Sequence, residues 1–377
     1  MNTAIGKAAE SYIYNLILKS DKNNPAWNSE NKLFSKQNKW NYIDACIIKA
    51  LSGYYEIENN EAVFDYIKDF MDSYINEDYS IKTLNPKEFN CDNYNGGKNL
   101  LFLYRKTSDE KYIKAADYLI SLINDHPRLK IGNLWHKTIY PDQIWLDGTY
   151  MMLPFMAEYA NIKNIPDIYA DIRNQLENIR NIMKDDKTGL YYHGYDESRK
   201  SLWCNEESGL SSEFWLRSNC WLCTALVDLY ELVKEKDMSD FISDMLTELL
   251  RALYSFQQNN NMLRQLPLCD NVRNYDETSG TALYSYSAIK ASNMNITDEF
   301  LNSGINALES IADNYISEIE NEIPVLKNIC LVAGLGGENN RNGSAEYYLS
   351  EPVVKNDAKG IAPFIMAYTE YRKSKSR

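Results

Sequence analysis

Histidine is scarce in this sequence, and the familiar catalytic and metal-binding motifs are absent. The chain of 377 residues holds only His126, His136 and His193. None of them stands in an HxH, HxxxH or HExxH arrangement, so their spacing does not indicate a zinc site. No GxSxG or Walker A motif occurs, and the glycine-rich run 334–337 lacks the strand–loop–helix setting of a nucleotide site. We therefore expect neither a metal nor a cofactor.

Positive charge is also in deficit. Lys and Arg number 40 against 53 Asp and Glu, which gives a formal net charge of -13. Such a chain is repelled at long range by nucleic acid and by anionic membrane surfaces, which argues against both as partners. A small acidic ligand would need a local basic anchor on this surface.

Long apolar runs and paired cysteines are missing as well. No run approaches the roughly 18 residues of a membrane span, and residues 1–20 lack the regions of a signal peptide. The seven cysteines are an odd number without disulfide-like spacing, which is typical of a reducing compartment. Cys220 and Cys223 have CxxC spacing inside an apolar helical run, which favours buried thiols over a redox pair. We expect a cytoplasmic monomer or small homo-oligomer.

What the sequence does contain is apolar residues at helical spacing along most of the chain. The pattern predicts helices over 3–19, 40–56, 60–75, 96–107, 110–125, 142–160, 165–183, 213–232, 239–258, 277–291, 297–315 and 358–372. About two to six residues follow each even-numbered helix before the last, whereas about fifteen to forty precede each even-numbered helix. Because short loops join antiparallel neighbours, this order predicts six helical hairpins.

Six hairpins can close into an all-α (α/α)6 barrel with the even-numbered helices inside. The chain is 44% hydrophobic and shows no break in composition, so we expect one domain over residues 1–377. A solenoid of helix pairs is the alternative, but it would have more equal loops and no concentrated site. In the barrel, the N-termini of the inner helices meet at one end together with the long loops. Their free N–H groups and positive dipole ends favour an acidic sugar there.

The tryptophans are expected at the same end of the barrel. They fall either in long loops or in the first turns of predicted inner helices: Trp27, Trp135 and Trp203 in loops, and Trp40, Trp145, Trp215 and Trp221 in helices. Because sugars present apolar C–H faces to aromatic rings, this distribution favours a carbohydrate-stacking cleft. The alternative is that the indoles simply plug the mouth of the barrel.

Two carboxylates at this end could form a catalytic pair. Asp92 lies in an Asn/Gly-rich turn before the fourth helix, and Asp147 lies about one turn inside the sixth. Paired carboxylates, one protonated and one ionised, are the usual equipment of glycosidases. Asp147 follows Trp145 in an apolar setting and is the better proton donor, whereas Asp92 could equally be a helix cap.

Arg217 is the basic group best placed to bind a carboxylate or vicinal hydroxyls. An ion pair with Glu213, four residues earlier on the same helix, is an equally common arrangement. His136 and His193 fall in long loops at the same end of the predicted barrel. Further acids near this end are expected to act as caps or loop pins, and they are Asp276, Glu277, Glu346 and Glu351.

Blocks spread through most of the chain resemble one family of enzymes. They are 40–42, 90–97, 135–151, 188–198, 203–209, 212–221, 277–280 and 356–360. In this order and spacing they are similar to the unsaturated rhamnogalacturonyl hydrolases of glycoside hydrolase family 105. A more distant likeness is to the unsaturated glucuronyl hydrolases of family 88.

The resemblance implies an (α/α)6 barrel, which agrees with the loop lengths, and an unusual hydration reaction. The substrate would be a small unsaturated oligosaccharide from a pectin lyase, with a C4=C5 double bond in its terminal uronate. Proton delivery to C4 and water addition at C5 give a hemiketal, which opens and releases the other sugar. By this resemblance Asp147 donates the proton, and Asp92 holds ring hydroxyls and orients Asp147. Substrate contacts are expected from Tyr42, His136, Lys137, Trp145, His193, Trp215, Arg217 and Trp221.

Three alternatives stay open. Residues 194–195 and 219–220 stand at positions that vary among relatives, which leaves the reducing-side sugar open between rhamnose-linked pectin pieces and other unsaturated glucuronyl units. A sugar epimerase on the same barrel would use a histidine pair, and a conventional glycosidase would attack the anomeric carbon. A catalytically silent sugar-binding protein is the third class, and the intact pair of Asp92 and Asp147 argues against it.

Overall fold

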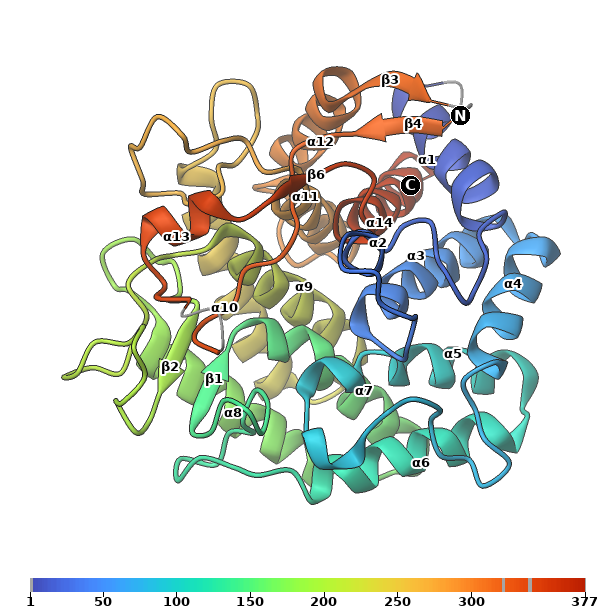
Figure 1. Ribbon diagram of the computed structural model, residues 1–377, viewed down its shortest axis with the longest axis horizontal. Coiled ribbons are helices and arrows are strands. Elements are labelled where there is room, and N and C mark those ends of the chain that lie inside the picture. The colour runs from blue at the N-terminus through green and yellow to red at the C-terminus, as the bar shows by residue number, and fades with distance from the viewer. Residues whose placement is uncertain (1–2, 321–322, 338–340, 377) are drawn as a thin grey trace.

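Twelve helices form two concentric rings in the computed structural model, which describes residues 3–320, 323–337 and 341–376 (Figure 1). The inner ring consists of α3 (Tyr42–Glu58), α5 (Gly97–Thr107), α7 (Asp147–Lys163), α9 (Leu216–Leu232), α11 (Thr278–Asn293) and α14 (Ala358–Lys375). The outer ring consists of α1 (Ala4–Ser11) with the π-helical turn η1 (Tyr12–Ile17), α4 (Glu61–Asp72), α6 (Glu110–Asn124), α8 (Asp167–Met183), α10 (Lys236–Ser255), and α12 (Leu301–Ser310) with η4 (Ile311–Tyr315). Each inner helix contacts the next, and α14 contacts α3, so the ring closes. The predicted (α/α)6 barrel is confirmed.

The inner helices are buried far more completely than the outer ones. Every residue of α11 is buried, and so are residues 358–371 of α14. The outer helix α8 buries one stripe, in which Ile172, Leu176 and Ile179 recur at helical spacing. Outer helices therefore keep a solvated face, whereas inner helices pack on all sides along most of their length.

Two inner helices start later than the sequence pattern predicts. Residues expected to open the sixth helix form instead the strand β1 (Gln143–Trp145), which pairs antiparallel with β2 (Gly194–Asp196). Asp142 has a positive φ of 60°, which a continuing helix does not allow. Asp147 is therefore the first residue of α7, not a residue one turn inside it. Trp215 likewise precedes α9 in extended conformation.

The long loops carry small elements that the helical pattern does not predict. They are α2 (Ser29–Leu33), α13 (Ala345–Ser350), and two antiparallel strand pairs, β3 (Ile316–Glu320) with β4 (Ile323–Leu326) and β5 (Ile329–Cys330) with β6 (Val353–Val354). The strand-like stretch 190–193 forms only an isolated bridge, between Tyr191 and Lys184, just before β2. These elements are too short for periodicity to reveal, yet they shape the loops above the barrel mouth.

The cysteines are all free thiols. Cys220 and Cys223 are buried inside α9, which confirms that the CxxC spacing reflects core packing. Burial raises the pKa of both thiols, so neither is poised as a thiolate. In the described ranges, no helix is both long and apolar enough to cross a membrane.

Close packing of α5 on α7 depends on Gly97. A Cβ atom added there would lie 2.5 Å from Cδ2 of the buried Phe155 ring. We expect Gly97→Ala to lower the free energy of unfolding by about 1–3 kcal/mol, measured from the midpoint of urea unfolding.

Gly53→Ala on α3 is the matched control. Its Cβ would meet only Cγ2 of Thr369, at 3.8 Å, which is an ordinary contact. Since alanine forms helix better than glycine by roughly 0.5–1 kcal/mol, this variant should be unchanged or more stable. Equal destabilisation of both variants would contradict a specific clash at Gly97.

Candidate active site

A cavity of about 670 Å³ opens at the N-terminal ends of the inner helices. It gathers six of the residues predicted from the sequence, namely Tyr42, Asp92, His136, Lys137, Trp145 and Asp147. Tyr42 and Asp147 are the first residues of α3 and α7, so the cavity lies at the predicted end of the barrel. The other four predicted residues are buried behind its wall and do not line it: His193, Trp215, Arg217 and Trp221.

Backbone hydrogen bonds between two loops bring Asp92 to Lys137. The N–H of Cys91 donates to the carbonyl of His136 over 3.0 Å, and Asp92 Oδ2 lies 2.8 Å from Lys137 Nζ. Asn90, not Asp92, caps the short helical turn, so the cap alternative for Asp92 is wrong. Burial alone would raise the pKa of Asp92, but the attraction of Lys137 and His136 outweighs it and lowers the pKa below its ordinary value. Asp92 is the ionised member of the pair.

Asp147 faces a buried imidazole that a tyrosine holds from the other side. Pairing of β1 with β2, and a bond from the N–H of Leu146 to the carbonyl of His193 (3.1 Å), place His193 beside Asp147. Its Nε2 lies 3.2 Å from Asp147 Oδ2, and its Nδ1 lies 2.6 Å from the hydroxyl of Tyr348. Burial raises the pKa of Tyr348 well above its ordinary value, so the phenol stays protonated and donates a hydrogen bond to Nδ1. Nε2 is the ring nitrogen on the side of Asp147, and it forms no hydrogen bond with the described residues.

An aromatic stack forms another part of the cavity wall. The rings of His136 and Tyr140 both stack on the indole of Trp145, with centroid distances of 4.3 and 4.6 Å. A backbone bridge between Lys137 and Tyr140 turns the chain back so that both rings reach the indole. Burial lowers the pKa of His136 to about 4, although the charge of Asp92 opposes this shift. His136 is therefore a neutral ring near pH 7 and adds no positive charge to the cavity.

Arg217 anchors the chain behind the cavity. Its buried guanidinium donates to the carbonyls of Cys330 and Leu331, and it lies 3.9 Å from the carboxylate of Glu277. The ion partner is thus Glu277 in place of the expected Glu213. Since Leu331 lines the cavity, Arg217 fixes part of the wall.

The predicted tryptophan cleft is wrong, because most of the indoles serve packing. Trp27 is fully buried and donates to the carboxylate of Asp44 over 2.8 Å. Trp221 stacks on the buried Tyr150 at a centroid distance of 4.6 Å. Of the seven indoles, only Trp145 lines the cavity, and two other rings already stack on it. Trp40, Trp203 and Trp215 are buried as well, so packing describes these five indoles better than a sugar-stacking cleft.

Most of the additional acids act as caps or loop pins, as expected. Glu277 caps α11 by accepting from the N–H groups of Ser279 and Gly280. Asp276 accepts from the hydroxyl of Tyr315 over 2.7 Å. Glu351 accepts from Tyr347 over 2.6 Å, but it also lines the cavity, which the sequence did not indicate.

Several other groups of the site were not predicted from the sequence. Lys36 and Arg341 line the cavity, and neither forms an ion pair with the part of the chain that the structure describes. Both lie in long loops, where no periodic pattern places a side chain. Tyr348 lies on α13, whose cap Ser344 before an apolar run was the one available signal for this short helix.

Comparison with known proteins places this site in a family. The family model described as Glycosyl Hydrolase Family 88 matches residues 17–375. A solved glycoside hydrolase from family 105 of C. acetobutylicum ATCC 824 is similar with 34% identity and a TM-score of 0.89, over 98% of this chain and 99% of that one.

Curated relatives are similar too. Protein Atu3128 of Agrobacterium fabrum is 34% identical over 230 residues, which are 58% of this chain and 97% of that protein. The unsaturated rhamnogalacturonyl hydrolase YesR of Bacillus subtilis is 24% identical over 305 residues, 79% of this chain and 84% of that one. Because the family model matches nearly the whole length of this chain, the chain belongs to the family 88 and 105 group of glycoside hydrolases, the unsaturated uronyl hydrolases.

Proposed function

We propose that this protein hydrates the C4=C5 double bond of unsaturated galacturonyl-rhamnose disaccharides, with Asp147 as the proton donor. The observation that carries the proposal is a pair of cavity carboxylates in unequal surroundings. Asp92 is held ionised by Lys137, whereas Asp147 has only the imidazole of His193 within ion-pair distance among the described residues. Two carboxyl groups in such unlike surroundings can take different roles, one as acid and the other as anchor.

In the proposed reaction, Asp147 alone donates the proton and takes one back. The protonated carboxyl gives its proton to C4 of the enol ether, and positive charge develops at C5 beside the ring oxygen. Water adds its oxygen to C5, and the Asp147 carboxylate takes the proton that this water loses. The resulting hemiketal opens and releases the second sugar. Nε2 of His193 lies 3.2 Å from Oδ2 of that carboxylate, so we assign the imidazole to positioning it.

The uronate carboxylate needs positive charge that Lys137 does not supply, because Asp92 neutralises that ammonium group. Arg341 lines the cavity without an ion pair to the described residues, and an arginine binds a carboxylate through two parallel hydrogen bonds. We assign the uronate to Arg341, with Lys36 nearby in the same wall. Arg217, first expected to bind a carboxylate, and His193, first expected among the substrate contacts, then act as positioning residues from behind the wall.

The remaining expected contacts divide in the same way. Tyr42 and His136 line the cavity and are proposed to touch the sugar rings. Trp215 packs on the ring of His193 at a centroid distance of 4.9 Å, so we assign it to holding that ring. Trp221, in the barrel interior, supports the floor through Tyr150.

The rhamnose-linked substrate is supported by the likeness to the unsaturated rhamnogalacturonyl hydrolase of Bacillus subtilis. An unsaturated glucuronyl disaccharide is the second candidate, because the hydration chemistry is the same for both. A sugar epimerase is less well supported: it needs a histidine that exchanges protons near neutral pH, and burial lowers the pKa of His136 to about 4.

Asp147→Asn should abolish hydration. Asparagine cannot deliver a proton to C4, so we expect kcat/KM to fall by about 10³-fold or more, since general acid catalysis contributes on the order of 10²–10⁴. The measurement is loss of the near-ultraviolet absorbance of the enoate with unsaturated galacturonyl-rhamnose. A panel of lyase-generated glucuronyl disaccharides, run beside it, identifies the preferred reducing-side sugar.

Asp142→Asn is the matched control for that variant. It makes the same change of charge five positions earlier, outside the cavity lining, at a positive φ that asparagine adopts readily. Its activity should stay within a few-fold of the wild type. Normal hydration by Asp147→Asn would remove Asp147 as the acid, and no absorbance loss with any disaccharide of the panel would reject the proposed reaction.

Tyr348→Phe should slow the reaction without weakening substrate binding. Loss of the hydroxyl leaves His193 Nδ1 without its hydrogen-bond partner, so the imidazole beside Asp147 loses the contact that fixes its orientation. We expect kcat to fall about tenfold with KM unchanged, and the pH profile of kcat to shift.

Tyr191→Phe removes a buried hydroxyl from the loop that carries His193. That hydroxyl has no hydrogen-bond partner in the described structure. This control variant should keep the wild-type pH profile. The same profile in both variants would show that Tyr348 supports packing only.

His136 should remain neutral through the physiological range. Its folded pKa of about 4 lies below the ordinary 6.5, so the unfolded chain binds the proton first as pH falls. Its contribution to stability is therefore present above pH 6.5 and is lost as pH falls toward 4, by up to about 3 kcal/mol. Imidazole ¹⁵N shifts and urea unfolding of wild type and His136→Gln at pH 7 and pH 5 measure this. Titration of His136 near pH 6.5 would contradict it and favour the epimerase.

A further inference from the structure

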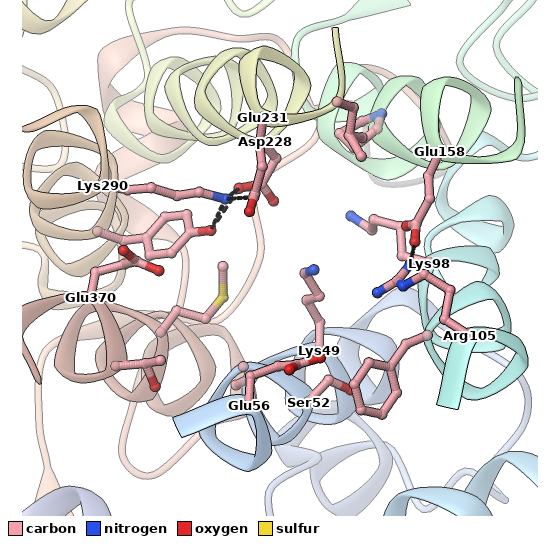
Figure 2. Close-up of a pocket in the computed structure, with 18 of the residues that line it drawn as sticks. Lys49, Ser52, Glu56, Lys98, Arg105, Glu158, Asp228, Glu231, Lys290 and Glu370 are labelled. Carbon is pink, nitrogen blue, oxygen red and sulfur yellow. Dashed lines mark hydrogen bonds and ion pairs between the residues drawn. The ribbon is translucent and has the colours of Figure 1, made fainter. Parts of the chain in front are cut away.

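A second polar cavity lies at the opposite end of the barrel from the active site (Figure 2). Its volume is about 530 Å³, and its lining residues come from all six inner helices. On α7, Asp147 lines the active site and Glu158 lines this cavity, and these two positions are about 16 Å apart along the helix. The hydration reaction uses none of the groups in it.

Most charged groups in this cavity already have partners. The pairs are Lys290 with Asp228 and Glu231, Lys373 with Glu370, and Arg105 with Glu158. Figure 2 shows the bonds of Lys290 to the carboxylates on α9. The pairs of Lys290 and of Arg105 join neighbouring inner helices, whereas Lys373 and Glu370 both lie on α14.

Three polar groups in the cavity have fewer hydrogen-bond or ion-pair partners than they could accept. Lys49 makes no hydrogen bond or ion pair within the described ranges, and Figure 2 shows its side chain pointing from α3 toward the middle of the cavity. Lys98 is 3% exposed and donates only to the carbonyl of Tyr150, over whose ring its ammonium group lies. Asp228 accepts from Lys290 through Oδ1, but its buried Oδ2 has no hydrogen-bond partner.

Leaving these groups unpaired is costly, because a buried charge without a partner loses its hydration. Burial lowers the pKa of Lys49, and it lowers the pKa of Lys98 to about 7, although Asp228 attracts both ammonium groups. Neither lysine forms an ion pair with Asp228. The space between them is where a ligand would complete all three.

We propose that this cavity binds a small hydroxy acid of the sugar-acid class. Its carboxylate lies between the ammonium groups of Lys49 and Lys98, and one of its hydroxyl groups donates to Oδ2 of Asp228. The site is a binding site distinct from the active site, and it does not depend on the substrate proposed there.

A hydroxy acid suits these groups better than an inorganic anion or a neutral sugar. Its carboxylate accepts from two ammonium groups, and its hydroxyl supplies the donor that Asp228 lacks. A sulfate ion has no donor for Asp228, and its second negative charge would face the negative carbonyl ends of the inner helices. The volume lies within the roughly 300–1,000 Å³ of small-molecule sites.

Calorimetric titration with D-galacturonate, acetate and L-rhamnose tests the proposal on three proteins: wild type, Lys49→Met and Lys36→Met. Acetate offers a carboxylate without hydroxyls, and rhamnose offers hydroxyls without a carboxylate. The two variants make the same change in the two cavities. Lys49 is only half-buried, and retained hydrolase activity at the other end of the barrel checks that its variant is folded.

We expect galacturonate to bind the wild type and Lys36→Met with equal affinity, and to bind Lys49→Met at least tenfold more weakly. Acetate and rhamnose should bind at least tenfold more weakly than galacturonate. Absence of galacturonate binding, or binding that only Lys36→Met removes, would overturn the site. Acetate or rhamnose binding as tightly as galacturonate would overturn the ligand class.

A measurement on the unmodified protein does not depend on any variant. Acetic anhydride acetylates exposed amines, and mass spectrometry reports the rate at each lysine. Galacturonate should slow acetylation of Lys49 at least tenfold and leave Lys163, on the same end of α7 but outside the cavity, unchanged. Equal rates at Lys49 with and without galacturonate would reject occupation of this cavity.

Discussion

The closed ring of inner helices constrains everything else in this molecule, because it leaves those helices almost no solvent-facing side. α11 is buried from Thr278 to Asn293, so its polar groups must find partners inside the barrel. Space for a polar ligand remains at the two ends, and a cavity lies at each. The N-terminal end offers free N–H groups and suits the acids Asp92 and Asp147, whereas carbonyl groups at the other end suit basic side chains.

Backbone hydrogen bonds between loops, more than side-chain contacts, assemble the active site on this barrel. The bond from Cys91 to His136 joins the turn of Asp92 to the next loop, and the bond from Leu146 to His193 joins the start of α7 to the one after. Such bonds form with almost any side chain. They carry no signature in the sequence, although each one decides which titratable groups become neighbours.

This difference explains how much could be predicted. Helix periodicity and connector lengths are properties of the whole chain, so the barrel and the end that carries the site were predictable. Asp147 opens α7 and Asp92 lies in the short turn before α5, and both were found from their residue type and from the resemblance of the surrounding blocks to the family. Tyr348 was not, because its role depends on a contact with His193 across 155 positions of sequence. The clustering of tryptophans led to the prediction of a sugar-stacking cleft, because burial in a core and stacking on a ligand both use the same apolar ring.

The basic groups of the site differ in whether they already have acidic partners within the protein. Lys137, in a loop, is neutralised by Asp92, and Arg217, on α9, by Glu277, so the two basic groups expected at the site from the sequence are used within the protein. Positive charge free to meet a uronate comes instead from Lys36 and Arg341, in loops whose length and sequence the barrel does not restrict. Helix starts can therefore keep the carboxylate chemistry constant while the loops change which sugar reaches it. A loop substitution can alter the proposed uronate contact without disturbing Asp147, the proposed proton donor.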